Sequence, residues 1–405
     1  MDIICVATPS WEGNYTKSTV ELIKCMAQRH RVLYIDYSYT CKDMLTGIFK
    51  KSTVPVKRMM GFQKRLRQVQ GANDSQLWLL TLPPILPANF IKNKKIYTFF
   101  QRINSFVIRR SILKASKKLN FSQPVVINAW HPFVGNFLYG KLNERLTIYY
   151  CIDEINEGPW TKEHGVYLET MFLKKVDAAV VTSQGLFHTR APIARNCFLV
   201  QNGVDFELFR HGFSFPKEAP VVIGFVGTIA SRIDFEILEA IAEHFPSAKL
   251  VIVGRVAFDG RPVDEEVARL KRYSNVEFTG AQPAEKLPDY LKTFHLGIIP
   301  NIKNAQTAAV YPMKINEYLA AGIPVVTTDF APLDEFLDVI TVAHSTAEFI
   351  QGIEHELTSD NDQKRIARQE LAKNNSWDNR ALIFEKIVEN LLTENHISTY
   401  KQTET

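Results

Sequence analysis

Residues 311–328 of this chain read YPMKINEYLAAGIPVVTT, a short amphipathic helix pattern that runs directly into an apolar strand pattern. Pro312 favours a helix N-terminus, because the N–H that proline lacks would have no partner there. Gly322 can adopt the left-handed conformation that ends many helices. Residues 323–326 have the composition of a buried parallel strand. The stretch therefore predicts one helix–strand unit of a parallel α/β sheet.

Two charged residues of this predicted helix, Lys314 and Glu317, are one turn apart and therefore share a face. A helix N-terminus and a lysine together suit phosphate groups, and a carboxylate can accept hydrogen bonds from the two hydroxyls of a ribose. These residues therefore predict a site for a nucleoside diphosphate. The structural alternative is an ordinary buried helix–strand unit with a Lys–Glu pair on its surface.

The same stretch resembles the donor-site signature of the GT-B glycosyltransferases, especially glycosyltransferase family 4, which is roughly P-x-K-x-x-E-[YF]-x-A-x-G-x-P-V-V. The fixed positions are filled by Pro312, Lys314, Glu317, Tyr318, Ala320, Gly322, Pro324, Val325 and Val326. The resemblance is specific over residues 202–395 and generic over residues 1–201.

The resemblance implies an α/β protein of the GT-B class. Such a protein has two Rossmann-like, doubly wound domains that face a cleft, and a C-terminal helix that crosses back to the first domain. The implied activity is transfer of a sugar from a nucleotide diphosphate sugar to a glycan or lipid-linked acceptor. The implied setting is polysaccharide biosynthesis for a cell envelope.

Alternating strand and helix patterns along the 405 residues also favour two doubly wound domains. The Gly-, Pro- and polar-rich stretch 203–220 is the expected boundary. We expect an acceptor- and membrane-facing domain over residues 1–205, a nucleotide-sugar donor domain over 206–375, and a return helix with a polar tail over 376–405. Ser376 is the expected N-cap of the return helix, which should end near Glu394.

The N-terminal segment MDIICVATPSWEG has no basic region and carries Asp2 beside its short apolar run, so it is typical of a first strand and not of a signal peptide. No apolar run approaches the length of a membrane span. Five cysteines without CxxC spacing favour a reducing compartment and exclude a cysteine zinc cluster. We therefore expect a cytoplasmic protein that is peripheral at the inner face of the plasma membrane.

Glycines and cations in the second half of the chain form the expected donor site. Gly227 ends a predicted strand, where glycine lets the backbone approach a ligand closely. Arg232 follows where the resemblance implies a cation for the donor diphosphate, although a solvated loop arginine is the alternative. Further predicted strands are followed by loops that approach the base and ribose in the family. The expected donor-binding residues are Gly227, Arg232, Arg255, Gly280, Lys314 and Glu317.

The chain departs from the family pattern at Ala309, where retaining members usually carry a second glutamate. A backbone group or Asn304 would have to replace that glutamate, or the catalytic strategy differs, so the stereochemistry stays open. Lys314, Arg232 and helix dipoles can neutralise a diphosphate. We therefore expect no metal and no cofactor, with a UDP- or GDP-linked sugar as the donor substrate.

Residues after predicted strands of the first half supply the expected acceptor side. Asp153 directly follows an apolar strand pattern, and the resemblance implies that it acts as a general base or orients the acceptor. His131 ends another predicted strand, at the place where open α/β sheets bind ligands. Both are expected catalytic residues, with a capping aspartate and a structural histidine as the alternatives. The expected acceptor-binding residues are Trp11, Glu12, Gly13 and Glu154.

The segment 41–120 contains 17 lysines and arginines against 2 acids, while the whole chain carries a net charge of +5. Apolar and aromatic residues interleave with these cations, a pattern typical of a membrane-interface helix. Nucleic acids also favour such surfaces, but no nucleic-acid motif is present. We therefore expect an anionic membrane surface as the partner and no nucleic acid, with a solvated basic face as the structural alternative.

Two other functions are compatible with the same fold and charge pattern. One is a GT-B sugar-nucleotide epimerase, which needs no acceptor. The other is a non-catalytic GT-B-like scaffold that binds membranes or glycans. A glycosyltransferase remains the first prediction, because the Lys314 and Glu317 pattern is the most specific motif in the chain.

Overall fold

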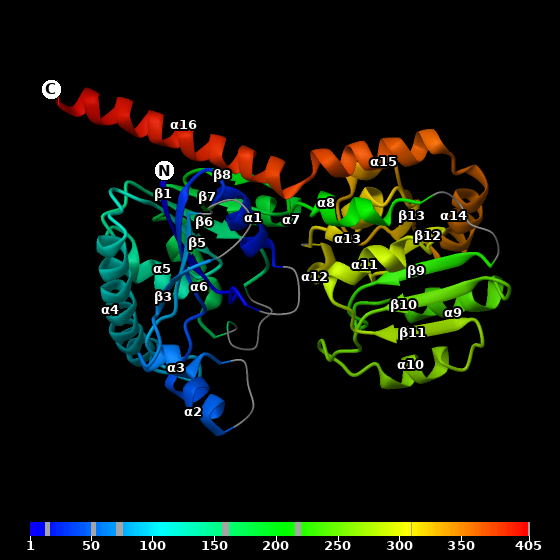
Figure 1. The fold of residues 1–405 in the computed structure, drawn as a ribbon, viewed down its shortest axis with the longest axis horizontal. Coiled ribbons are helices and arrows are strands. Elements are labelled where there is room, and N and C mark those ends of the chain that lie inside the picture. Colours follow the sequence, from blue (N-terminus) through cyan, green and yellow to red (C-terminus); the bar gives the residue numbers. More distant parts are fainter. Residues whose placement is uncertain are drawn as a thin grey trace. The chain divides into compact units, whose positions relative to one another are not determined.

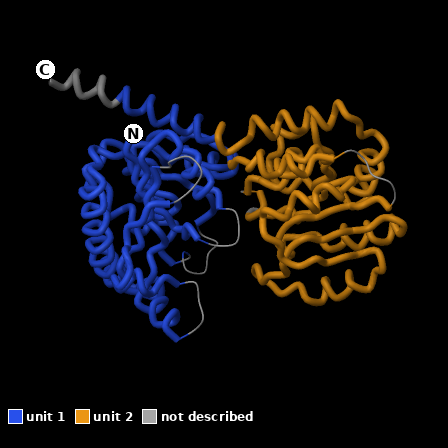
Figure 2. The backbone as a smooth tube through the Cα atoms, viewed as in Figure 1, with its two compact units in different colours: residues 1–201, 380–405 blue, residues 202–379 orange. Residues whose placement is uncertain are grey.

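The computed structural model describes residues 1–12, 17–49, 54–69, 76–155, 161, 163–214, 220–308 and 310–403, with backbone alone at residues 305 and 395–403. The chain divides into two compact units (Figure 2). The first unit contains Met1–Gln201 and Arg380–Thr405, and the second contains Asn202–Asn379. Each unit is built around one sheet (Figure 1).

The sheet of the first unit has the strand order β3-β4-β2-β1-β5-β6-β7-β8. Its strands are β1 (Asp2–Ala7), β2 (Arg31–Ile35), β3 (Leu66–Gln68), β4 (Leu77–Leu80), β5 (Val125–Ala129), β6 (Leu146–Cys151), β7 (Ala178–Val181) and β8 (Cys197–Leu199). Neighbours are parallel except β3, which pairs antiparallel with β4 at the edge. The central strands are apolar runs, as expected where helices cover both faces of a parallel sheet.

Helices connect these strands in the first unit. They are α1 (Ser18–Met26), α2 (Cys41–Phe49), α3 (Val56–Met59), α4 (Lys94–Lys118), α5 (Pro132–Leu138), α6 (Gly165–Leu173) and α7 (Gln184–Arg190). Ile108 of α4 and Val134 of α5 pack with Ile4 and Val6 of β1 in one apolar cluster. Helices α4 and α5 therefore cover one face of this sheet.

The C-terminal helix α16 (Trp377–Thr403) crosses back onto the first unit, as predicted. The ring of Phe384 lies edge-on to Tyr150 of β6, with 5.7 Å between centroids. Nε of Arg29, just after α1, donates to Glu385 at 2.9 Å. The prediction that this helix ends near Glu394 was too short, because no glycine or proline follows to interrupt it.

The sheet of the second unit has the strand order β11-β10-β9-β12-β13-β14, and all its pairs are parallel. The strands are β9 (Val222–Val226), β10 (Lys249–Val253), β11 (Val276–Gly280), β12 (Leu296–Ile299), β13 (Val325–Thr328) and β14 (Thr341–Ala343). Its helices are α8 (Phe206–Phe209), α9 (Phe235–His244), α10 (Asp264–Leu270), α11 (Leu287–Leu291), α12 (Ala305–Ala308), α13 (Met313–Ala320), α14 (Thr346–Ser359) and α15 (Asp362–Asn374), with single 3-10 turns at Arg210–Gly212, Ala284–Lys286 and Asp334–Phe336.

Two apolar clusters cover the two faces of this second sheet. One contains Ile315 and Leu319 of α13, and the other contains Ile241 of α9 and Ile353 of α14. The predicted fold class, two Rossmann-like parallel sheets and a returning C-terminal helix, is therefore confirmed. Within the part of the chain that the structure describes, no helix combines the length and the apolar content of a membrane span.

Candidate functional site

The centre of the candidate donor site is the place where α13 begins beside the end of β9. Strand β9 leads into Gly227, which has a φ of +153°. A methyl group on Gly227 would lie 2.3 Å from Cε of Lys314, so the lysine side chain rests on this backbone turn. Glycine is therefore needed here both for its backbone conformation and for the close approach of the lysine.

Charges at this turn are only partly compensated. Burial lowers the pKa of Lys314, the nearby Arg232 lowers it further, and Glu317 opposes both. Burial raises the pKa of Glu317, and Lys314 opposes that shift. Arg232 Nη1 lies 3.5 Å from a carboxylate oxygen of Asp259, in a partly exposed pair. Two cations therefore approach one another closely enough to disfavour the charge on Lys314, which is the electrostatic condition for binding an anion.

The loops after β9, β10 and β12 hold Arg232 in this position through backbone contacts. The N–H of Ile302 donates to the carbonyl of Arg232 at 2.8 Å, and Ile229 forms a parallel bridge with Val256. Asp234, two residues after Arg232, accepts from the N–H groups of Glu236 and Ile237 as the N-cap of α9.

Gly254 is a residue of this edge that the sequence reasoning did not place in the site. A methyl group on Gly254 would lie 1.8 Å from the carbonyl oxygen of Gly227, so the turns after β9 and β10 are in close contact. The only sequence signal is its position at the end of a predicted strand. Arg255, the next residue, is exposed. Gly280 lies one strand further out, as the last residue of the edge strand β11, with open space around it.

The structure thus brings together Gly227, Arg232, Lys314 and Glu317, places Arg255 on the neighbouring turn, and leaves Gly280 at the outer strand. Ala309, the position of the departure from the family pattern, lies outside the described residues. Nearby, the side chain of Asn304 accepts from the N–H of Thr307 at 2.9 Å and so closes a local turn.

In the first unit, Asp153 and His131 follow the adjacent parallel strands β6 and β5 and therefore lie at the same end of the sheet. Asp153 is exposed, and one of its carboxylate oxygens accepts from the N–H of Glu154 at 2.9 Å. Trp130 Nε1 donates to the Asp153 carbonyl at 2.9 Å, with Trp130 at a φ of +51°. This contact links the two strand ends.

The backbone of His131 is held by two hydrogen bonds to the side chain of Asn128. Its N–H donates to Asn128 Oδ1 at 3.0 Å, and Asn128 Nδ2 donates back to the His131 carbonyl at 3.1 Å. Burial lowers the pKa of the imidazole to about 4. The ring is therefore neutral near pH 7, and it can donate or accept a hydrogen bond but carries no charge.

The carboxylate of Glu154 is engaged inside the first unit. Both of its oxygens accept hydrogen bonds from Arg190, which also donates to Glu169 at 2.9 Å. Tyr149 donates to Glu169 at 2.7 Å. Arg190 is 5 % exposed, so this is a buried ion-pair network. Arg190 was not predicted from the sequence, because β7 and most of α7 separate it along the chain from Glu154 and Glu169.

The remaining predicted acceptor residues follow β1. Glu12 pairs with Arg58 at 3.3 Å and with Arg67. The N–H of Trp11 donates to the buried Asp36 at 3.0 Å, and its ring lies edge-on to Tyr34. Gly13 lies outside the described residues.

A D-x-D triplet, a spacing that can hold a metal ion, occurs at residues 360–362. Asp360 pairs with Arg365 at 2.5 Å and with Arg368 at 2.6 Å, while Asp362 lies in the first turn of α15. The triplet therefore forms a structural ion pair and a helix start. Across the described ranges, no group of three or more His, Cys, Asp or Glu side chains could hold a metal ion.

Two parallel sheets, a glycine-lined strand edge with two cations, and a returning C-terminal helix define a protein of the GT-B class. Solved structures of the same fold support this class. Sucrose-phosphate synthase from Thermosynechococcus elongatus has a TM-score of 0.66 at 14% identity, over 97% of this chain and 99% of that chain. A second structure, described as Trehalose-6-phosphate from E. coli bound with UDP-2-fluoro glucose, gives 0.67 at 10% over 97% and 99%. HepE from Anabaena in complex with UDP and glucose gives 0.59 at 12% over 96% and 99%.

The family follows from sequence comparison. Residues 220–359 match the family described as Glycosyl transferases group 1. The glycosyltransferase TuaH of Bacillus subtilis (strain 168), named for teichuronic acid biosynthesis, is 28% identical over 219 residues, which is 50% of this chain and 51% of the relative. The match thus spans about half the length of that curated relative. The predicted family resemblance is confirmed over residues 220–359, which match the group 1 glycosyltransferases.

Proposed function

We propose that this protein transfers a sugar from a nucleotide diphosphate sugar to a glycan or lipid-linked acceptor in polysaccharide biosynthesis. The observation that carries the proposal is the approach of Arg232 to Lys314 beside Gly227, at the first turns of α13. An arginine that disfavours the charge on a neighbouring lysine, beside the N-terminus of α13, favours an anion with several charges. A donor diphosphate has this charge, and the leaving nucleoside diphosphate gains more of it during transfer.

The other donor residues follow from this placement. Glu317, one turn further along α13, is assigned to the ribose hydroxyls, and the exposed turn at Arg255 to the remainder of the nucleotide. Two of the similar structures are described as complexes with UDP or a UDP-sugar, which favours UDP within the expected choice of a UDP- or GDP-linked donor. No metal is required by this assignment, because Arg232, Lys314 and the helix N-terminus can stabilise the leaving diphosphate.

Asp153 and His131 are assigned to the acceptor side. An exposed carboxylate at a strand end can take the proton of an acceptor hydroxyl if the transfer is inverting, and can orient the acceptor if it is retaining. The neutral His131 can only contribute a hydrogen bond near pH 7. The relative named for teichuronic acid biosynthesis supports a polysaccharide pathway. A sugar-nucleotide epimerase would convert the donor without an acceptor, and product analysis with and without acceptor separates the two activities.

The test is thermal unfolding of the purified protein with UDP, GDP, ADP and CMP, for the native chain, Glu317→Ala and the control Glu265→Ala. Glu265 is an exposed glutamate of the same unit on α10. A ligand that binds only the folded state stabilises it by about 2.7 kcal/mol at a hundredfold excess over Kd. We expect one diphosphate to raise Tm in the native chain and in Glu265→Ala, and much less in Glu317→Ala. No response to any nucleotide would refute the donor site.

We also propose that the first unit docks on an anionic membrane. No residue of α2 is buried, and its apolar side chains Leu45, Ile48 and Phe49 are 52%, 52% and 83% exposed. Phe62 is 76% exposed after α3, whose last turn carries Lys57 and Arg58. An apolar face beside cations is the pattern of helices that lie in a membrane interface.

Vesicle sedimentation tests this docking with phosphatidylcholine vesicles that contain or lack phosphatidylglycerol. We expect Ile48→Ser with Phe49→Ser to weaken binding to the anionic vesicles at least tenfold. The control changes, Leu337→Ser with Ile366→Ser, remove apolar side chains that are 56% and 52% exposed in the second unit and should leave binding unchanged. Equal losses in both pairs would refute α2 as the docking element.

A further inference from the structure

A groove in the first unit is not used by the proposed transfer. It has a volume of about 620 Å³ and lies between α4, α5 and α6. Four cations line it, namely Arg102, Arg109, Lys141 and Lys175, and no acidic side chain does so among the described residues. The groove is therefore strongly electropositive.

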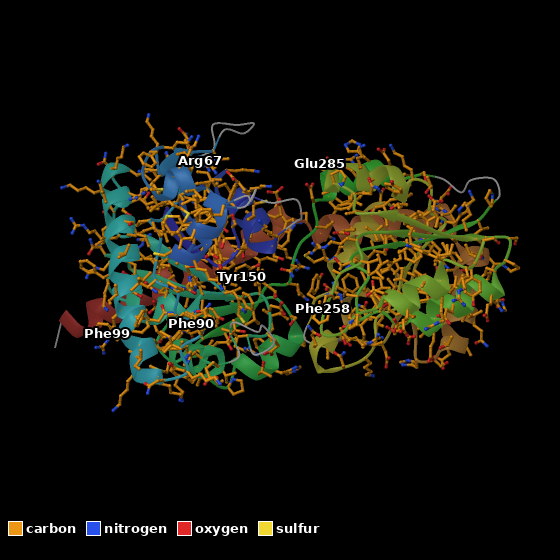
Figure 3. The ribbon with its side chains drawn as sticks, turned by 90° about the horizontal axis from the view of Figure 1, so that it is seen from below. Arg67, Phe90, Phe99, Tyr150, Phe258 and Glu285 are labelled. Carbon is orange, nitrogen blue, oxygen red and sulfur yellow. The ribbon has the colours of Figure 1, made fainter. Side chains whose placement is uncertain are left out.

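Helix α4 presents two different apolar faces. Ile108 and Ile112 of one face are fully buried in the core. The other face carries Ile96, Phe99, Ile103 and Phe106, which are 50%, 61%, 38% and 60% exposed. Their spacing of three and four residues forms one continuous stripe. Phe99 marks this stripe on α4 in Figure 3.

The stripe and the groove adjoin one another at Phe106, which belongs to both. Arg102 precedes Phe106 by one turn and Arg109 follows it by one turn, so the two cations flank the ring on the same side of the helix. Phe137 and Met171 add apolar surface to the opposite walls. Cationic and apolar side chains therefore lie next to each other. This arrangement suits a ligand with an anionic group and a hydrocarbon chain.

Two buried polar atoms in the groove wall have no hydrogen-bond partner within the described residues. They are Oγ of Ser105, a residue that is 4% exposed, and Oδ1 of Asn136. Asn136 Nδ2 is satisfied by the carbonyls of Pro132 and Leu168. An unpaired buried polar atom is unfavourable, and both atoms lie beneath the surface of this groove wall.

We propose that the groove binds a single anionic glycerophospholipid. The phosphate lies among Arg102, Arg109, Lys141 and Lys175, and an acyl chain follows Phe106 along the α4 stripe. The inference rests on the proposed membrane docking, but it assigns a distinct site: α2 provides the general attachment, and the groove selects the headgroup.

The experiment uses dihexanoyl phosphatidylglycerol below its micelle concentration, so that no membrane surface is present. Calorimetry on the full chain should show binding of one lipid per protein. Dihexanoyl phosphatidylcholine and inorganic phosphate should both bind at least tenfold more weakly, since one lacks net charge and the other lacks hydrocarbon. Phosphate that binds as tightly as the anionic lipid would reduce the groove to a bare anion site and overturn the proposal.

The variant Arg102→Gln with Arg109→Gln should weaken lipid binding by about 25-fold, given roughly fivefold for each cation near an anionic lipid. Lys117→Gln with Lys118→Gln is the control. These substitutions also remove two positive charges from α4, but at exposed lysines of its last turn, outside the groove. A second variant, Met171→Glu, places a carboxylate in the groove without removing a cation and should also abolish binding. Unchanged affinity in both groove variants would overturn the assignment.

The α2 changes Ile48→Ser and Phe49→Ser separate this site from general docking. They should reduce vesicle binding and leave the affinity for the monomeric lipid unchanged. Loss of monomer binding in that variant would mean that the groove is not an independent site. A thymidine oligonucleotide that binds more tightly than the lipid and is lost in the groove variants would assign the groove to nucleic acid instead.

Discussion

The ends of the strands differ sharply between the two units. In the first unit two of the three carboxylates expected on the acceptor side have counter-charges: Glu154 is held by Arg190, and Glu12 by Arg58 and Arg67. In the second unit, Arg232 and Lys314 approach each other, and Glu317 and Asp259 compensate them only in part. Two carboxylates of the first edge are therefore held in ion pairs while Asp153 is exposed, whereas two cations of the second edge lie close together.

This difference separates residues that stabilise the fold from residues that are left for a ligand. A buried ion pair is tolerated in the folded chain only while both partners are present, because removing one partner leaves the other charge buried without compensation. Two neighbouring cations repel each other and so raise the free energy of the folded chain. A bound anionic ligand removes this repulsion. Substitutions in the first edge should therefore act mainly on stability, and substitutions in the second edge mainly on binding.

The largest effect is expected from Arg190→Gln in the first unit. Glu169 is only 5% exposed and would lose its counter-charge, so the free energy of unfolding should fall by about 3–5 kcal/mol. Hydrogen exchange of the β6 and β7 amides measures this locally. Arg210→Gln is the control, since its pair with Glu207 is exposed and contributes less than about 1 kcal/mol. A loss under about 1 kcal/mol for Arg190→Gln would mean that Glu154 is available to an acceptor.

In the second unit, Gly254→Ala should destabilise by about 3 kcal/mol or more, because its methyl group would lie 1.8 Å from the Gly227 carbonyl oxygen. Gly280→Ala is the matched control: its φ is +73°, but no atom lies within 4 Å of the added carbon, so only the backbone penalty of about 1 kcal/mol applies. Denaturant unfolding measures both. Equal losses would show that the two turns can move apart, and that the edge is not built on their contact.

Lys314→Met should separate stability from binding. The affinity for the preferred nucleoside diphosphate should fall about 10- to 100-fold, since a hydrogen bond to a charged group contributes roughly 1.5–3 kcal/mol. The free energy of unfolding should change by less than about 1 kcal/mol, because burial and Arg232 already disfavour the charge on Lys314. Calorimetry and denaturant unfolding measure the two quantities, with Lys292→Met, an exposed lysine of the same unit, as control. A destabilised variant with unchanged affinity would place Lys314 with the structural charges of the first unit.

Sequence patterns predicted the two sheets because their signals are local. Apolar runs and the glycines that follow them lie within a few residues of each other, and the motif around Lys314 combines a helix start, two charges and a strand in 18 residues. The three-residue strand β3 escaped prediction, because LRQ has no apolar alternation and forms only by antiparallel pairing with β4.

The charge network of the first unit could not be predicted in the same way. Arg190 reaches Glu154 across 36 residues and Glu169 across 21, and only the adjacency of β6 and β7 brings these side chains together. The close contact of Gly254 with Gly227 likewise depends on the register of β9 and β10. The Arg190 ion pairs and the Gly254–Gly227 contact therefore cannot be predicted from the spacing of these residues along the chain.

The smallest expected effect concerns His131, a half-buried residue of the first edge that has no counter-charge among the described side chains. Burial lowers its pKa to about 4 from the usual 6.5. Because the folded state binds the proton more weakly than the unfolded state, the neutral ring contributes stability above pH 6.5 that is lost as the pH falls through 4. Between pH 7 and pH 5 this loss should be about 2 kcal/mol. Urea unfolding of the native chain and His131→Gln at both pH values measures it: the variant should lose less stability by that amount, and the exposed control His355→Gln should behave as the native chain does. An unchanged pH dependence in His131→Gln would mean that the imidazole is solvated or paired, and that the first edge, like the second, has a charge available to a ligand.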